Sequence, residues 1–138
     1  MKKNLFDELE YWIGTSEEAN WNEYIAEHVA KAVISSLSLD DWILLNAVTL
    51  SRPNYWQQRL VASLGEDGSH NSVELLKCLL FSNFREVKIM ATCELAWAET
   101  PIGEELKFKI IEIVDEIVKV EGEDVYKNYS EIVDLLNR

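Results

Sequence analysis

The sequence predicts an all-α fold, a single domain of stacked antiparallel helical hairpins over residues 1–138. Apolar residues recur at spacings of three and four along most of the chain, and alternating apolar–polar runs are rare. Glycine (five) and proline (two) are scarce, which suits long helices joined by short turns. A chain of 138 residues that is 48% hydrophobic is long enough for one domain with its own core.

The positions of turn and capping residues divide the chain into eight predicted helices. Ser38 in "SLDDW" is placed to cap a helix, with Asp41 three residues later. Pro53 suits a first helical turn, and "GEDGSHNS" predicts a loop. The predicted helices cover residues 3–13, 17–36, 40–51, 54–65, 71–82, 85–99, 102–120 and 123–137.

One part of the chain matches another at a sequence offset of 31. The segment 42–64, "WILLNAVTLSRPNYWQQRLVASL", aligns with 73–95, "VELLKCLLFSNFREVKIMATCEL". The break between two helices falls at the same place in both copies, with Ser51 on Ser82. A helix-turn-helix unit of this length indicates hairpins that stack on one another.

The segment 84–99, "FREVKIMATCELAWAE", is apolar nearly all round, which is expected of a helix at the centre of a helical domain. We therefore predict that Trp56 and Trp97 are buried, because each lies among the apolar positions of a second helix. Cys78 and Cys93 also lie in apolar helical patterns, and we predict two small core residues rather than a disulfide.

Two segments resemble the second helix of a HEAT-like repeat. "NFREVKIMATCELAWAE" has the polar start, the Val, the small residues and the Leu of that helix, and "PNYWQQRLVASLGE" looks like a weaker version with Trp56 in the Val place. The resemblance implies stacked hairpins over about 60 residues. The Asp and Arg often seen at fixed places in that repeat are not clearly present, so an irregular α-helical bundle is the alternative.

The charge of the chain is strongly acidic. It has 25 acidic and 13 basic residues, a net charge of −12, and the acids are spread along its length. Such a charge repels nucleic acid and anionic membranes and attracts basic proteins. The alternative is that the charge only keeps the protein soluble. No apolar run approaches the roughly 18 residues of a membrane span, and the N-terminus lacks a signal-peptide run, so we expect a cytoplasmic protein.

No catalytic or metal-binding motif is present. His28 and His70 are the only histidines, and the chain has no His-x-x-x-His pair, Cys-x-x-Cys pair, nucleophile elbow or phosphate-binding loop. We therefore expect no enzyme activity, no cofactor and no metal site.

The N-terminal stretch "FDELEYWIGTSEEANWNEY" combines aromatic residues with carboxylates, a combination that suits a basic protein partner. The alternative is a pair of amphipathic helices with aromatics in the core and acids in water. The candidate partner-binding residues are Asp7, Glu8, Glu10, Glu17, Glu18, Trp21 and Glu23. An acidic C-terminal cluster has the same two interpretations; its members are Glu112, Asp115, Glu116, Glu121, Glu123 and Asp124.

In size, charge and HEAT-like character the chain resembles bacterial immunity proteins, which bind a toxin, often a basic nuclease, and neutralise it. The resemblance implies stoichiometric inhibition of a basic toxin without catalysis. Independently of it, the acidic charge and the lack of a basic stripe lead us to expect no binding to nucleic acid or membrane. Two alternatives stay open: a helical scaffold or adaptor that binds another protein, and an enzyme subunit whose site is dispersed along the sequence.

Overall fold

The fold is all-α in the part of the chain that the computed structural model describes, namely residues 4–14, 21, 25–65, 67–98 and 101–122. These residues contain no strand, as the sequence predicts. They form the helices α1 (Leu5–Ile13), α2 (Ala26–Ser35), α3 (Leu39–Val48), α4 (Asn54–Leu64), α5 (His70–Leu79), α6 (Arg85–Trp97) and α7 (Gly103–Glu121), with a short 3₁₀ helix, η1 (Thr49–Ser51).

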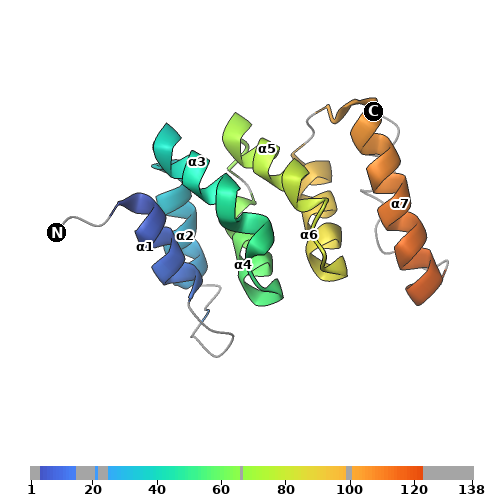
Figure 1. Ribbon diagram of the computed structural model, residues 1–138, viewed down its shortest axis with the longest axis horizontal. Coiled ribbons are helices and arrows are strands. Elements are labelled where there is room, and N and C mark those ends of the chain that lie inside the picture. Colours follow the sequence, from blue (N-terminus) through green and yellow to red (C-terminus); the bar gives the residue numbers. More distant parts are fainter. Residues whose placement is uncertain (1–3, 15–20, 22–24, 66, 99–100, 123–138) are drawn as a thin grey trace.

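The helices are arranged in two layers, with α7 at one end (Figure 1). Helices α1, α3 and α5 form the nearer layer of the view, and α2, α4 and α6 form the farther one. Helix α2 packs on α4, α4 packs on α6, and α6 packs on both α5 and α7. Each pair of consecutive helices from α1 to α6 therefore contributes one helix to each layer.

The predicted helix boundaries hold within a few residues except near α2. We predicted a helix from residue 17, but Trp21 and Ile25 precede α2, which begins at Ala26 without a side-chain cap. Apolar spacing continues across this point, so the spacing alone does not locate the start of the helix. The helix predicted over 123–137 lies outside the described residues.

The offset of 31 found in the sequence recurs in the helix boundaries. It separates the first residues of α3 and α5, the last residues of α3 and α5, and the first residues of α4 and α6. The paired boundary residues are Leu39 with His70, Val48 with Leu79, and Asn54 with Arg85. The two central hairpins therefore start and turn at matching points.

The caps of α3 and α5 repeat in the same register. The hydroxyl oxygen of Ser38 accepts a hydrogen bond from Asp41 N, and that of Ser69 accepts one from Ser72 N, each at 3.2 Å. The prediction for Ser38 is confirmed, and the Asp41 carboxylate completes the capping box by accepting from Ser38 N at 3.0 Å. Burial by itself would raise the pKa of Asp41, but hydrogen bonds from Ser38 and from the Phe6 backbone outweigh it and lower the pKa.

A single core runs through all seven described helices, and its buried positions in the two central hairpins also match at the offset of 31. Trp56 is 3% exposed, which confirms its predicted burial, and its counterpart Val87 is fully buried. Other pairs that are buried in both hairpins include Trp42 with Val73, Leu45 with Leu76, Leu60 with Ala91, and Leu64 with Leu95.

Two predictions of burial are wrong. Trp97 is 75% exposed, because it lies on the face of α6 that also carries Met90 and Glu94, and this face lines a groove rather than the core. The core prediction also fails for Cys78, which is exposed on α5, whereas Cys93 is half-buried and packs against the core. Partial burial and the nearby Glu74 carboxylate raise the pKa of the Cys78 thiol, so the thiol is a poor nucleophile at neutral pH.

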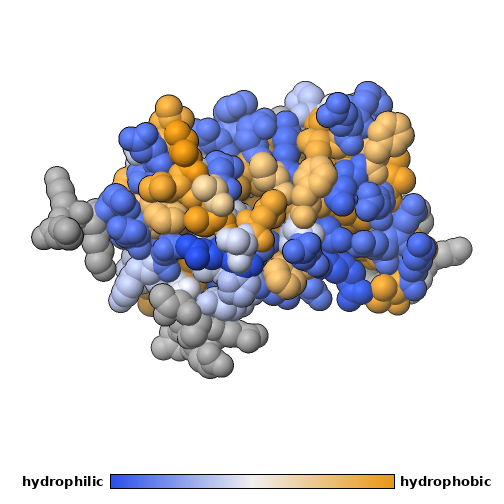
Figure 2. Space-filling view, in the orientation of Figure 1, coloured by the Kyte–Doolittle hydropathy of each residue, from blue (hydrophilic) through white to orange (hydrophobic). Residues whose placement is uncertain are grey.

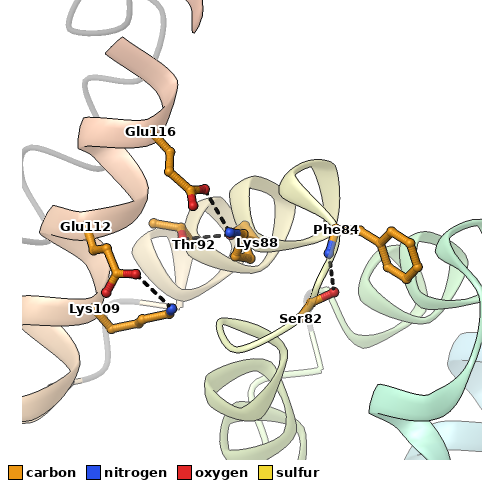
Figure 3. A network of polar contacts seen from close by, with 7 residues as sticks. All are labelled: Ser82, Phe84, Lys88, Thr92, Lys109, Glu112 and Glu116. Atoms are coloured by element: carbon orange, nitrogen blue, oxygen red, sulfur yellow. Dashed lines mark hydrogen bonds and ion pairs between the residues drawn. The ribbon is translucent and has the colours of Figure 1, made fainter. Parts of the chain in front are cut away.

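A buried glutamine joins the two central hairpins. The Gln57 amide donates to the backbone oxygen of Arg52 at 2.8 Å, and its side-chain oxygen accepts from the Ser82 hydroxyl at 2.7 Å. The Ser82 oxygen in turn accepts from Phe84 N at 3.1 Å, in the turn between α5 and α6 (Figure 3). One side chain thus satisfies polar groups in both turns.

Lys88, in the second central hairpin, links that hairpin to the next helix much as Gln57 links the first hairpin to the second. Lys88 is the counterpart of Gln57 at the offset of 31, and its ammonium group is 2.7 Å from the Glu116 carboxylate of α7 (Figure 3). This hydrogen bond from Lys88 lowers the pKa of Glu116. A polar side chain at this position therefore links each central hairpin to the element that follows it.

The two tryptophans provide a matched test of the core. Trp56→Ala should lower the free energy of unfolding by about 3–5 kcal/mol, because it opens a large cavity. Trp97→Ala should change it by less than about 0.5 kcal/mol, as at other exposed positions. Urea unfolding measures both values, and equal losses would contradict the assignment of one tryptophan to the core and one to the surface.

Gln57→Ala should lower the free energy of unfolding by about 1–3 kcal/mol, because the Ser82 hydroxyl and the Arg52 carbonyl lose their buried partner. Gln58→Ala is the control, since Gln58 bonds only to Asn54 within its own helix and is half-buried. Urea unfolding of both variants compares them, and a loss for Gln57→Ala no larger than for the control would show that the link is unimportant.

Candidate functional site

Acidic and basic side chains differ in how the fold exposes them. Nine basic residues lie in the described part of the chain; eight are half-buried, and Lys119 alone is exposed. Eight carboxylates in the same part are exposed: Asp7, Asp40, Glu74, Glu86, Glu104, Glu105, Glu112 and Asp115. The surface is therefore more acidic than the composition alone indicates.

Most of the half-buried cations pack against a carboxylate or an aromatic ring. Arg52 forms an ion pair with Glu10 of α1 and lies over the Trp56 ring, 5.5 Å from its centroid. Lys109 lies over the Phe81 ring at 5.1 Å and is 3.5 Å from Glu112. Similar pairs join Lys77 to Glu74, Lys88 to Glu116, and Lys107 to Glu104. In these contacts the basic side chains bind other parts of the fold, so they are less available to solvent.

The N-terminal candidate residues that the structure describes do not form one cluster. Asp7 is exposed and Glu8 is half-buried, both in the first turn of α1. The Glu10 carboxylate is already engaged by Arg52, so a partner would compete with an internal ion pair. Glu17, Glu18 and Glu23 lie outside the described residues. On α1, then, Asp7 is the candidate with the most accessible carboxylate.

Trp21 lies apart from Asp7, near the opposite end of α1. The Arg59 guanidinium donates to the backbone oxygen of Ile13 at 2.9 Å, and it lies over the Trp21 and Tyr55 rings, 5.8 and 4.9 Å from their centroids. Trp21 is half-buried and packs against the core. Its predicted role as an aromatic anchor beside the acids of α1 therefore remains a prediction, and its observed neighbours are a cation and a tyrosine.

A groove that the sequence did not predict runs along α2, α4 and α6. It consists of two adjoining hollows of about 490 and 570 Å³, and Glu27, Ala62 and Met90 line both. Trp97 lines one hollow, and Trp21 lines the other. The spacing of Met90, Glu94 and Trp97 in the sequence would have indicated a shared face, but it could not show that the face is uncovered.

The groove carries both signs of charge. Its charged lining residues among those described are Glu27, Lys31, Arg59 and Glu94. Gly65 lies at its floor, where a Cβ would come within 2.7 Å of a Glu94 carboxylate oxygen and would displace that side chain. The groove is therefore a shaped surface with aromatic residues, but it is not the most acidic face.

The described residues contain no cluster of His, Cys, Asp and Glu that could hold a metal ion. His28 and His70 are both exposed, on α2 and at the start of α5. Within the same residues, no helix is long and apolar enough to cross a membrane. Comparisons with protein-family models, with curated proteins and with solved structures gave no match.

The uneven exposure of charges predicts how fast lysines react with an acylating reagent. Lys119 should be acylated fastest among the described lysines, and Lys88 slowest, because the Lys88 side chain is only 11% exposed and is bound to Glu116. Mass spectrometry after brief labelling measures each rate, and labelling in denaturant gives the control in which the rates converge. A folded protein in which Lys88 reacts as fast as Lys119 would contradict the proposed packing of cations.

Proposed function

We propose that the protein binds a basic protein partner and neutralises it by forming a stoichiometric complex, as bacterial immunity proteins do with toxins. The observation that carries the proposal is the surface: eight exposed carboxylates against one exposed lysine among the described residues. The partner that this chemistry suits best is a toxin nuclease in the cytoplasm.

The electrostatic argument has two parts. A nuclease needs a basic surface to hold the phosphates of its substrate, and an acidic protein can cover that surface in their place. Long-range attraction also speeds the encounter, which matters for an inhibitor that must act before its target does. Because eight of the nine described cations are half-buried, fewer positive charges oppose a basic partner at the surface.

The fold suits a rigid inhibitor, and we propose that its two central hairpins are HEAT-like repeats. The supporting feature is the offset of 31 shared by helix boundaries, serine caps and buried positions. Stacked hairpins present broad surfaces whose side chains are held in place by their neighbours. A pre-organised surface loses little conformational entropy on binding, which favours a tight complex.

Co-expression with the product of the adjacent gene tests the proposal most simply. If that product is a basic toxin, this protein should restore growth, and the two purified proteins should elute as one complex of fixed stoichiometry at low salt. Turnover of a substrate by the purified protein alone, or a specific partner that is itself acidic, would overturn the proposal.

Charge reversal tests the predicted contacts on α1. Asp7→Lys with Glu8→Lys should slow association with the partner roughly tenfold at low salt, because both carboxylates lie in the first turn of α1. Glu104→Lys with Glu105→Lys is a matched control, since these acids occupy the first turn of α7. Stopped-flow kinetics gives the rates, and circular dichroism verifies that both variants keep their helices. An α1 variant that associates as fast as the control would exclude this contact.

A further inference from the structure

The outward face of α3 is a continuous aliphatic stripe. Its residues are Leu39, which is 70% exposed, Ile43, which is 60% exposed, Ala47, and Leu50, which is 42% exposed. They are spaced by four, four and three residues, so they lie on one side of the helix and of the 3₁₀ turn that follows it. Figure 2 shows hydrophobic colouring along α3, and at about 1.5 Å per residue the stripe is about 16 Å long.

The architecture itself does not require this stripe, because α5 does without it. At the offset of 31, the counterparts of Leu39, Ile43 and Ala47 are His70, Glu74 and Cys78, and all three are exposed. Two of them, His70 and Glu74, are polar, and at the last position Phe81 lies under the ammonium group of Lys109. The fold therefore accepts polar residues at these places, and the aliphatic ones on α3 need another explanation.

Carboxylates border the stripe at its N-terminal end. Asp40 is exposed in the first turn of α3, and Asp7 is exposed in the first turn of α1. The two turns are neighbours, because α1 packs on α3 and the Phe6 backbone lies close enough to the Asp41 carboxylate to lower its pKa. At the other end, the charge of Arg52 is offset by its ion pair with Glu10.

We propose that the α3 stripe is the docking site for an amphipathic basic helix of the protein partner. The aliphatic residues of such a helix would cover Leu39, Ile43 and Leu50, and its lysines or arginines would meet Asp40 and Asp7. Helix-in-groove and helix-on-helix recognition uses anchors at these same spacings of three, four and seven. This inference rests on the proposed function. It adds a set of apolar anchor residues that would carry much of the binding energy, which exposed charges alone would not provide.

Charge complementarity favours this occupant over a second copy of the chain. A dimer through α3 would join two chains that each carry a net charge of −12. A basic helix removes the same repulsion while burying the same aliphatic area.

The test uses a designed helical peptide of about 14 residues with leucines on one face and lysines on the other, and a second peptide with glutamates in place of the lysines. Fluorescence anisotropy should show that the wild-type protein binds the Leu/Lys peptide and not the Leu/Glu peptide. The variant Leu39→His with Ile43→Glu, which copies the residues of α5, should weaken binding at least about tenfold and keep its helical spectrum.

The control variant is Phe108→His with Ile111→Glu, at exposed apolar positions of α7. It should bind the Leu/Lys peptide as the wild-type protein does. Equal weakening by both variants, or binding that neither variant changes, would overturn the proposal. So would a wild-type dimer in sedimentation that the α3 variant converts to a monomer, because a second copy would then occupy the stripe.

The natural partner separates this inference from the proposed function. If the partner binds and the α3 variant dissociates no faster than the wild-type protein, the docking site is wrong and the proposed function stands. If no basic partner binds, the proposed function is wrong, and the peptide measurements still decide whether α3 docks a basic helix.

Discussion

The fold depends on the stacking of one helical hairpin on the next. No pair of helices can cover its own apolar residues, so α4 must pack on both α2 and α6, and α6 must pack on both α4 and α7. Polar side chains fix the register of this stacking: Gln57 joins the turns of the two central hairpins, and Lys88 joins the second hairpin to α7. Gln57 and Lys88 are counterparts at the offset of 31, so the same site in each hairpin sets the relation to its neighbour.

This stacking also determines the surface charge. Arg52 joins α1 to the turn before α4, Arg59 joins α1 to α4, and Lys88 joins α6 to α7. The three cations that link two elements are half-buried as a result. Eight of the described carboxylates, in contrast, remain exposed. The same packing therefore has two consequences. It links the helices through cations, and it leaves an acidic surface that we propose attracts a basic partner.

The sequence could predict what depends on local spacing and composition. The all-α class, the cap at Ser38, the burial of Trp56 and the offset of 31 follow from periodicity, capping chemistry and alignment of the chain with itself. The cap at Ser69 was detectable as the counterpart of Ser38, but it lay in a segment that was assigned to a loop.

The sequence could not predict which apolar faces would find a neighbour. Trp97 and the α3 stripe have the same helical spacing as core residues, yet no described helix covers them. The separation of Trp21 from Asp7 and the groove along α2, α4 and α6 depend in the same way on how distant elements pack. Burial is a property of the assembled layers, and a stripe of apolar residues is necessary for it but not sufficient.

The most direct test of the account is the association rate constant of the wild-type protein with its partner as a function of salt. Raising the ionic strength from about 0.1 M to about 1 M shortens the screening length from about 10 Å to about 3 Å. If exposed carboxylates guide a basic partner to this surface, the rate constant should fall steeply over that range while the dissociation rate changes much less. A rate constant that stays constant or increases with salt would contradict the central claim that the acidic surface serves to bind a basic protein.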